Sequence, residues 1–339
     1  MKLENCFKEN SLYLIAEIGG NHQGSFEKAL ELCELAINSD ADCIKFQLYT
    51  AENLVNPLIS DDRYKHFKKF ELTEDQHIQL AKKCIQSGKD YTASIWDMNM
   101  VSFIEPYIKF FKIGSGDLTC REYLRRFAVT GKPIILSTGL SNEKEVHEAI
   151  KYIREVNNTY FNKGKLVIMQ CTSMYPIEDA DANLSVISNF SKIDHIIPGY
   201  SDHTRGNKAL INSVLLGAKV LEFHFTDNKN NATFRDHLVS LELEDVIQMK
   251  KDAIQALEMI GDPEKKPLEI EIKNGHLESF RRAIYPKKDI EKGEKLSKDN
   301  IICLRPCKGI GAEYYDEIIG KELLVSIKKF QALDWNILR

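Results

Sequence analysis

The sequence predicts a (β/α)8 barrel followed by a small β-rich domain, and three observations lead to that prediction. Short β-branched or aromatic runs alternate with longer amphipathic stretches about eight times before residue 260. Eight such units in roughly 250 residues match the length of a closed barrel. Polar residues gather at the carboxyl ends of the short runs, where barrels carry their active sites. A doubly wound open sheet is the alternative fold, because strand propensity does not show that a sheet closes.

Eight runs are expected to form the barrel strands, because each is short, apolar and bounded by turn residues. These runs are 12–18, 43–48, 91–95, 110–113, 133–137, 166–171, 196–201 and 220–225. Apolar residues recur at helical spacing in residues 26–38, 143–156 and 243–259, which predicts helices there.

A change of composition after Met259 indicates a domain boundary. The sequence GDPEKKP that follows is polar, charged and broken by two prolines. We therefore predict a barrel over residues 1–262, a linker over 263–274 and a second domain over 275–339.

The second domain contains only short apolar runs, at 283–285, 301–304 and 323–325, separated by glycines and charged turns. A domain of about 65 residues has little core of its own. We expect it to pack against another surface.

The composition favours a globular protein with a small-molecule ligand. Of the 339 residues, 43% are hydrophobic and 28% are charged, which is enough apolar material for a full core. The formal net charge is only −4, so no general attraction to nucleic acid or to an anionic membrane is expected. No run approaches the ~20 apolar residues that span a bilayer, and the first ten residues lack the apolar core of a signal peptide. A cytoplasmic protein is the expectation.

The eight cysteines show no paired spacing, and most lie in apolar stretches, as reduced buried thiols do. Cys303 and Cys307 come closest to a metal motif. They lack a second pair of ligands, so two incidental thiols are a better interpretation than a zinc site.

Polar residues stand at or just after the end of nearly every predicted strand. A single such serine is usually a turn residue, and a single lysine usually reaches water, but the repetition along consecutive strands favours a functional site. The residues are Glu17, Lys45, Gln47, Ser94, Lys112, Ser115, Ser137, Thr138, Thr172, Ser173, Tyr175, Ser201, His203, Glu222 and His224.

Three pairs among these residues have a spacing of two, which places both members on one face of a strand. If one member points into the barrel, its partner does too. The pairs are Lys45 with Gln47, Ser201 with His203, and Glu222 with His224.

His203 and His224 lie at the ends of adjacent predicted strands. Two neutral imidazoles with open positions suit a divalent transition ion such as Mn²⁺. Two hydrogen-bonded core histidines are an equally good interpretation of the spacing. Asp202 and Glu222 beside them are candidates to orient the rings. The remaining histidines considered, which are expected to be solvated, are His66, His77, His147, His195 and His276.

One lysine and several hydroxyl groups suit a bound phosphate. Lys112 supplies the charge, while Ser115, Ser137, Ser201 and Ser94 supply hydroxyl groups. The glycines of the sequence IGSG let backbone N–H groups approach an anion. No P-loop or dinucleotide fingerprint is present, which disfavours nucleotide binding.

Eight motifs occur in an order that resembles the sialic acid synthase family. The motifs AEIGGNHQG, KFQ, FKIGSGDL, KPIILSTGL, CTSMYP, GYSDHT, LEFHFTD and DHLVSLE begin at residues 16, 45, 111, 132, 171, 199, 221 and 236. They are similar to those of the phosphoenolpyruvate-dependent synthases of N-acetylneuraminate, legionaminate and pseudaminate. Beyond the linker, RRAIYPKKDIEKGEKLSKDNI and LRPCKGIG resemble the antifreeze-like (SAF) domain of that family. The resemblance covers essentially the whole chain.

This resemblance implies a reaction and a role for each matching residue. Phosphoenolpyruvate would condense with the open-chain aldehyde of an N-acylated hexosamine to give a nine-carbon keto acid and phosphate. A divalent metal, Mn²⁺ foremost with Mg²⁺ or Co²⁺ as alternatives, is implied. The implied roles are metal binding for His203 and His224, a carboxylate or base near the metal for Glu17, phosphate binding for Lys112, Ser115, Ser137 and Ser201, carboxylate binding for Lys45 and Gln47, and sugar contact for Tyr175 and Asp236.

Arg305 in LRPCKG matches an arginine that the family extends into the barrel of the partner chain. The resemblance therefore implies a domain-exchanged homodimer. A surface arginine beside Pro306 is the alternative interpretation.

The chain departs from the family pattern at three places. It has ASIW with Ser94 where the family often has STPF, it has Ser173 where the family often has asparagine, and NNATFR precedes Asp236 in place of a proline- and glycine-rich turn. The last two changes fall in regions that contact the sugar, which favours an altered hexosamine. A synthase that uses a phosphorylated aldose and a catalytically silent sugar- or anion-binding protein are the alternative functions.

Overall fold

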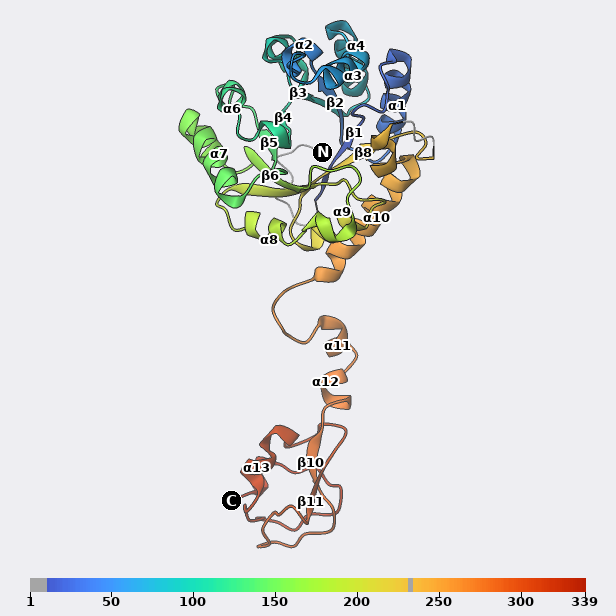
Figure 1. The fold of residues 1–339 in the computed structure, drawn as a ribbon. Helices are drawn as coiled ribbons and strands as arrows, with labels where there is room; N and C mark the ends of the chain where they lie inside the picture. Colours follow the sequence, from blue (N-terminus) through green and yellow to red (C-terminus); the bar gives the residue numbers. More distant parts are fainter. Residues whose placement is uncertain (1–10, 231–233) are drawn as a thin grey trace. The chain divides into compact units, whose positions relative to one another are not determined.

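The computed structural model describes residues 11–230 and 234–339. The chain forms two compact units that divide between Gly261 and Asp262 (Figure 1).

The first unit is a closed parallel barrel. Strands β1 to β8 pair in sequence order, and β1 also pairs with β8, which closes the sheet and excludes the open-sheet alternative. A short strand, β9 (Ser240–Leu241), extends the sheet beside β8. The barrel strands are Tyr13–Glu17, Cys43–Leu48, Asp90–Ile95, Phe111–Ile113, Ile134–Ser137, Leu166–Cys171, Ile196–Ser201 and Val220–Phe225. The predicted barrel is confirmed.

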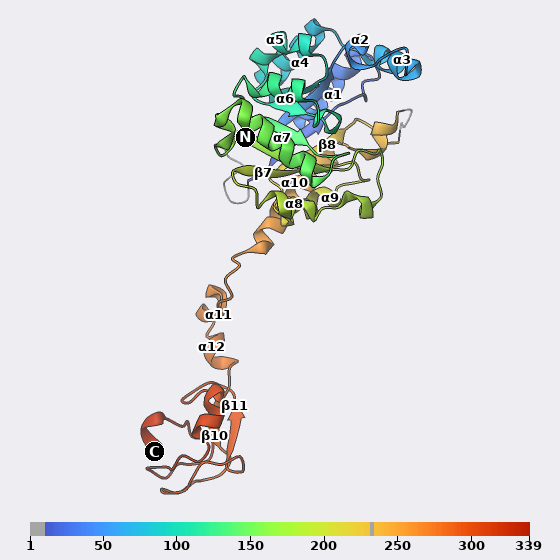
Figure 2. The ribbon, with the colours of Figure 1, turned by 60° about the vertical axis from the view of Figure 1, so that its left-hand side comes forward.

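Helices surround these strands (Figures 1 and 2). Several begin at residues whose side chains cap the first turn, such as Ser25, Thr73 and Asn142. The helices are α1 (Phe26–Asn38), α2 (Ala51–Leu54), α3 (Asp61–Phe70), α4 (Glu74–Gln86), α5 (Val101–Ile104), α6 (Arg121–Ala128), α7 (Glu143–Val156), α8 (Val186–Phe190), α9 (Lys208–Leu215) and α10 (Leu243–Ile260). Three of them, α2 to α4, lie between β2 and β3.

Residues along each strand alternate between two apolar environments. Ala16, Phe46 and Leu136 belong to a large core that the strands share with the helices. The intervening residues form a separate cluster inside the barrel, the apolar lumen cluster, which consists of Tyr13, Ile15, Cys43, Phe110, Ile135, Val167, Met169, Ile197 and Val220. One face of every strand therefore packs on helices, and the other points into the lumen.

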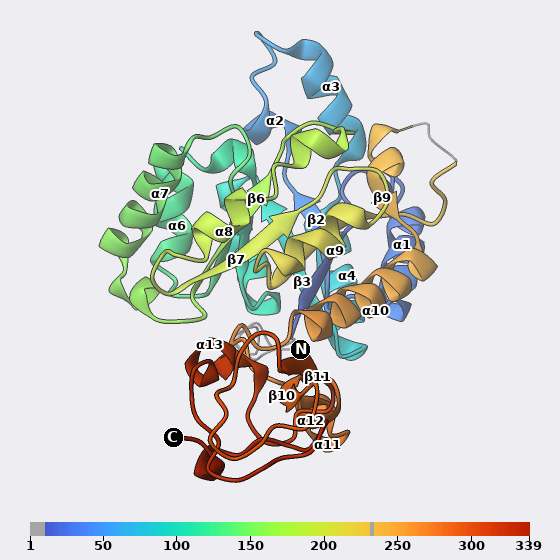
Figure 3. The ribbon, with the colours of Figure 1, turned by 90° about the horizontal axis from the view of Figure 1, so that it is seen from below.

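The second unit has its own small core. Strands β10 (Ala283–Pro286) and β11 (Ile301–Leu304) pair antiparallel. Both are labelled in the orange and red unit of Figure 3. Helices α11 (Glu269–Lys273), α12 (His276–Ser279) and α13 (Tyr315–Ile318) belong to this unit, so the predicted linker contains a short helix. Leu323 makes only an isolated bridge to Leu338, although a strand run was expected there. The core residues include Ile284, Ile301 and Ile318.

One histidine prediction is wrong. His77 on α4 is fully buried, and its Nδ1 lies 2.7 Å from the hydroxyl oxygen of Tyr91. A helical position facing Phe46 and Tyr91 removes the ring from solvent, which the local sequence did not reveal. The other histidines expected to be solvated are exposed: His66, His147, His195 and His276.

The cysteines of the described residues are all free thiols. Cys33 and Cys84 touch inside the helical layer, with their sulfur atoms 3.4 Å apart. Cys303 and Cys307 are partly exposed. Among the residues described, no helix combines the length and apolar character needed to cross a membrane.

Candidate active site

A cavity of about 310 Å³ lies at the carboxyl ends of the barrel strands, and its walls include residues from all eight strands or the loops after them. It brings together most of the residues that the sequence analysis selected. These are Glu17, Lys45, Gln47, Ser94, Lys112, Ser115, Ser137, Ser173, Tyr175, Ser201, His203, Glu222 and His224.

Four buried charged side chains interleave on one side of this cavity. Lys45 Nζ lies 2.7 Å from Glu17 Oε2 and 3.8 Å from Glu222 Oε1. Lys112 Nζ lies 3.4 Å from the same Glu222 oxygen. The Glu222 carboxylate therefore bridges the two lysines, and the two positive and two negative charges balance each other.

The pKa values of the two carboxyl groups move in opposite directions. Burial raises the pKa of Glu17 to about 7, although the charge of Lys45 opposes the shift. Burial acts on Glu222 in the same sense, but the charges of Lys112 and Lys45 outweigh it and lower the pKa of Glu222. Burial also lowers the pKa of Lys112, against the attraction of Glu222. Glu17 is thus suited to exchange a proton near neutral pH, while Glu222 stays ionised.

Serine hydroxyl groups complete this charged layer. Lys45 donates to Ser94 Oγ at 3.1 Å, Lys112 donates to Ser137 Oγ at 2.8 Å, and Ser201 donates to Glu222 at 3.1 Å. Each of these hydroxyl groups thereby touches a charged partner, which gives the cavity preorganised polar groups.

Gly139 in the loop after β5 is required by close packing. Its backbone N–H donates to Ser115 Oγ at 3.0 Å. A Cβ atom at this position would lie 2.3 Å from Ser173 Oγ and 2.9 Å from Ser115 Oγ. A larger residue here would turn both cavity serine hydroxyl groups away from the loop.

The imidazoles of His203 and His224 lie side by side, with ring centres 5.5 Å apart and ring planes inclined by 57°. His203 Nδ1 lies 2.7 Å from the carbonyl oxygen of Thr172, so Nδ1 carries the proton and the lone pair of Nε2 is available. His224 Nδ1 is buried without a hydrogen-bond partner among the described residues. Burial lowers the pKa of both rings, which keeps them neutral. The interpretation as two hydrogen-bonded core histidines therefore does not account for His224.

Two protein-family models match this chain. A model of the NeuB family matches residues 32–265, and a model of the SAF domain matches residues 281–339. The chain belongs to the NeuB family.

Relatives of this NeuB family member span nearly its whole length. The N,N'-diacetyllegionaminic acid synthase of Legionella pneumophila is 32% identical over 96% of this chain and 94% of its own. The pseudaminic acid synthase of Campylobacter jejuni is 31% identical over 98% of each chain. A crystal structure of N-acetylneuraminic acid synthetase from Leptospira borgpetersenii, 24% identical, shares the fold over 78% of this chain and 90% of its own, with a TM-score of 0.72.

NeuB synthases generally depend on a metal ion, and the donors present here fit one held by two imidazoles. Both rings are neutral, their centres lie 5.5 Å apart, and His203 Nε2 has a lone pair available for a metal ion. Within residues 11–230 and 234–339, no group of three or more His, Cys, Asp or Glu side chains is arranged around a metal position. Water or substrate oxygen atoms would therefore supply the other ligands.

Tyr175 covers the two imidazoles of this NeuB site. Its ring centre lies 4.0 Å from that of His203 and 5.5 Å from that of His224. The guanidinium carbon of Arg235 also contacts the tyrosine ring, at 5.0 Å from its centre. The histidines are thereby shielded on one side by an aromatic ring.

Asp236 lies in an adjoining chamber of about 770 Å³ that shares Gln47, Tyr175 and His224 with the first cavity. Its Oδ2 is 3.8 Å from His224 Nδ1. Burial raises the pKa of Asp236 to about 6, against the charge of Arg235. Arg305 lies in the second unit, with its guanidinium carbon 5.3 Å from the ring centre of Phe280.

Some strand-end residues do not belong to the cavity of this family member. Asp202 accepts hydrogen bonds from Tyr200 and Thr204 and makes no hydrogen bond or ion pair with either imidazole. Thr138 and Thr172 donate to backbone carbonyl groups. These three residues hold the loops, so the orienting role expected for Asp202 is wrong.

Other lining residues were missed by the sequence analysis. The partners of Glu222 were also missed: it was selected as a strand-end residue and as a candidate to orient the histidines, yet it contacts both lysines. Arg63 and Phe67 on α3 and Trp96 after β3 also line the cavity. Nothing local marks α3 as part of the site, because its sequence DDRYKHFKKF reads as a solvated helix.

Proposed function

We propose that this chain condenses phosphoenolpyruvate with the open-chain aldehyde of an N-acylated hexosamine and releases a nonulosonic acid and phosphate. The observation that carries the proposal is the charged layer around Lys112 in the same buried cavity as two neutral imidazoles. Membership of the NeuB family supports it, because relatives of that family include a legionaminic acid synthase and a pseudaminic acid synthase.

Lys112, Ser115, Ser137 and Ser201 bind the phosphate group of phosphoenolpyruvate in this proposal. The Lys112 ammonium group is buried and already has a hydroxyl neighbour, so a phosphate oxygen meets a cation that water does not screen. The ion pair with Glu222 holds Lys112 in place before the substrate arrives.

The carboxylate of phosphoenolpyruvate binds near Lys45 and Gln47. Lys45 is positioned by Glu17 and by Ser94, which accepts its hydrogen bond. Burial would lower the pKa of Lys45, but the carboxylates of Glu17 and Glu222 raise it, so this side chain remains a cation. Two lysines thus hold the two anionic ends of one small substrate.

The bonds change in two steps. The enol carbon of phosphoenolpyruvate attacks the aldehyde carbon, so that the C=C π electrons form the new C–C bond and positive character develops on the carbon that bears the phosphate. The π electrons of the aldehyde C=O bond move onto its oxygen, which takes up a proton and becomes a hydroxyl group. Water then adds to that carbon, and the C–O bond to phosphate breaks. The ionised Glu222 carboxylate supplies negative charge in the same buried cavity while the positive character develops.

His203 and His224 would hold a divalent metal, with Mn²⁺ the first choice and Mg²⁺ or Co²⁺ as alternatives. When bound, the metal supplies a Lewis acid that polarises the acceptor aldehyde. The hydrogen bond from His203 to the carbonyl oxygen of Thr172 fixes that ring and aims its free nitrogen.

Glu17 accepts a proton from the attacking water. Its pKa of about 7 suits a general base at neutral pH, and Gln47 donates to its Oε1 at 3.2 Å. The alternative role for Glu17 is a structural carboxylate beside the metal.

Tyr175, Ser173 and Asp236 form the acceptor side of the proposed site, and a partner chain supplies Arg305 in a domain-exchanged homodimer. Arg305→Ala is then expected to raise the KM for the sugar more than the KM for phosphoenolpyruvate, because a guanidinium group makes paired contacts to sugar oxygens. Equal effects on both constants would contradict this role.

The test is phosphate release from phosphoenolpyruvate with Mn²⁺ and a panel of acceptors: N-acetylmannosamine, a 2,4-diacetamido-6-deoxyhexose, and a phosphorylated aldose without an acyl group. Release with an acylated hexosamine only, together with a nine-carbon product in mass spectrometry, is the expected result. Release with the phosphorylated aldose alone would favour the other synthase, and no release with any acceptor would favour a silent binding protein.

A further inference from the structure

Asp236 is held in place by a short turn that returns the chain to the barrel. The turn, η7 (Arg235–Val239), is followed directly by β9, which pairs in parallel with β8 so that Ser240 lies opposite His224. The turn itself lies at the carboxyl end of β8, because His237 Nδ1 is 2.7 Å from Oγ1 of Thr226, the residue that follows that strand. The Asp236 carboxylate consequently lies beside the imidazole of His224, at 3.8 Å.

The first set of contacts around this turn begins at Asn21 in the loop after β1. Its side-chain amide donates to the carbonyl oxygen of Phe225 and to Ser240 Oγ, both at 2.9 Å. Ser240 Oγ in turn donates to the backbone carbonyl oxygen of Asp236 at 2.6 Å. Asn21 and Ser240 are buried, so these hydrogen bonds do not compete with water.

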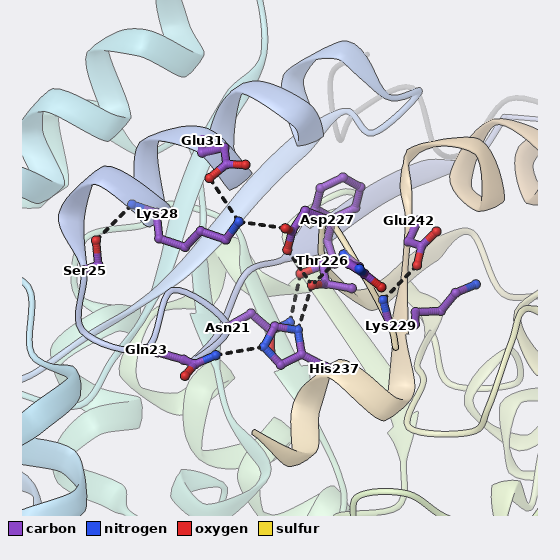
Figure 4. A network of polar contacts seen from close by, with 12 residues as sticks. Asn21, Gln23, Ser25, Lys28, Glu31, Thr226, Asp227, Lys229, His237 and Glu242 are labelled. Atoms are coloured by element: carbon purple, nitrogen blue, oxygen red, sulfur yellow. Dashed lines mark hydrogen bonds and ion pairs between the residues drawn. The ribbon is translucent and has the colours of Figure 1, made fainter. Parts of the chain in front are cut away.

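The second set of contacts runs through His237 (Figure 4). His237 Nδ1 lies 2.7 Å from Thr226 Oγ1, and Thr226 donates to Asp227 Oδ1 at 3.2 Å. Asp227 also accepts from Lys28 at 2.7 Å. Because the Thr226 hydroxyl donates to Asp227, it accepts from His237, which places the proton on Nδ1. His237 Nε2 then accepts from the side-chain amide of Gln23 at 3.3 Å, so all donors point the same way.

We call four of these residues the brace: Asn21, Thr226, His237 and Ser240. None of these four side chains lines the cavity or the adjoining chamber. They act on a substrate only through Asp236. Moreover, no described residue donates a hydrogen bond to the buried Oδ1 of Asn21, which is unfavourable and indicates that the arrangement is not optimised for stability alone.

We propose that the brace positions the Asp236 carboxylate beside His224 and that its four members are positioning residues for acceptor binding. The inference rests on the proposed function, in which Asp236 contacts the sugar. Side chains from the loop after β1 and from the residue directly after β8 thereby set the geometry of Asp236.

The test removes one hydroxyl group without changing the shape of the side chain. Thr226→Val deletes the acceptor of His237, and Thr226→Ser restores it. The matched control is Thr92→Val, because Thr92 is also buried and donates to the carbonyl oxygen of Phe110, away from the acceptor side. Ser240→Ala is a second variant that breaks the other set of contacts.

The expected result is a rise of about tenfold in the KM for the acceptor in Thr226→Val and in Ser240→Ala, with the KM for phosphoenolpyruvate and kcat within about twofold. Thr226→Ser and Thr92→Val should keep the acceptor KM close to that of the wild type. Unchanged acceptor KM in both Thr226→Val and Ser240→Ala, or equal changes for both substrates, would overturn the proposal.

Amide hydrogen exchange of residues 235–239 gives a measurement that does not depend on turnover. Exchange should be faster in Thr226→Val and unchanged in Thr92→Val, and equal exchange in the two variants would also overturn the brace. A wild-type protein that releases no phosphate with any acceptor contradicts the proposed function alone, because the exchange measurement still decides whether the brace exists.

Discussion

The two halves of the barrel lumen are built from the same strands and the same inward-facing positions, but their chemistry is opposite. The half towards the amino ends of the strands contains the apolar lumen cluster. Two residues further along, Glu17 follows Ile15, Lys45 follows Cys43, and Lys112 follows Phe110. The alternation along a strand therefore sets which way a side chain points, while its position along the strand decides whether it serves packing or chemistry.

Burying the side chains of the charged half costs free energy. Removing charges from water costs several kcal/mol for each ion, and pairing offsets that cost only with good geometry. Apolar residues like those of the other half would fill the same space without that cost. The comparison implies that substitutions in the charged half mainly change activity, and those in the apolar half mainly change stability.

The largest expected effect is that of Lys112→Met. It removes the cation of the proposed phosphate site and leaves Glu222 with the longer contact to Lys45 and the hydrogen bond from Ser201. We expect kcat/KM for phosphoenolpyruvate to fall about 1000-fold. Lys109→Met is the control. Lys109 is an exposed lysine just before the same strand, and it forms an ion pair with Asp90. Similar losses in the two variants would remove the distinction between the halves.

In the apolar half, Ile197→Ala should lower the free energy of unfolding by about 3 kcal/mol, because it opens a cavity in the apolar lumen cluster. Ile197 lies on β7 four residues before Ser201 of the charged half. Denaturant unfolding measures the stability change, and kcat/KM at 25 °C should stay within about twofold. A large loss of activity in the folded variant would show that the halves are not separable.

Glu17→Gln distinguishes a catalytic role from a structural role for one carboxyl group of the charged half. It keeps the size of the side chain and removes the group whose pKa is about 7. If Glu17 is the base, kcat should fall about 100-fold while Mn²⁺ binding is unchanged. Full turnover with normal metal binding would leave Glu17 only a structural role.

His77 is a buried titratable group outside the charged half, and we expect it to affect stability but not activity. Burial lowers the pKa of His77 from 6.5 to about 3. Below pH 6.5 the unfolded chain binds a proton that the folded protein does not bind until about pH 3, so stability falls as the pH drops. This group should cost about 2 kcal/mol at pH 5.

The matching measurement compares denaturant unfolding of the wild type and His77→Gln at pH 7.5 and pH 5. The loss between these values should be about 2 kcal/mol smaller in the variant, with kcat unchanged at pH 7.5. An equal pH dependence in both proteins would contradict the assigned pKa shift.

The sequence predicted the elements whose signal is local. Barrel strands and long amphipathic helices such as α7 and α10 followed from periodicity, because one face of each is buried. Helix α3 was missed because Phe70 is its only buried residue, so it has almost no apolar face. Likewise, His77 becomes buried through Phe46 and Tyr91, which are distant in the sequence.

For the site, strand ends and residue spacing selected the side chains, but not their partners. The spacing of two in Glu222 and His224 places both in the lumen. It does not reveal that Glu222 lies between two lysines, since those come from β2 and β4 and meet only when the barrel closes. The contacts of Asn21 with β9 depend on closure in the same way.

Mn²⁺ binding, measured by electron paramagnetic resonance of the free ion, tests the central claim most directly. The account predicts one bound ion per wild-type chain and loss of that ion in the double variant His203→Gln/His224→Gln. Thermal unfolding of both proteins checks that they are folded. No uptake by the wild type, or equal uptake by the double variant, would contradict a metal site between these two imidazoles.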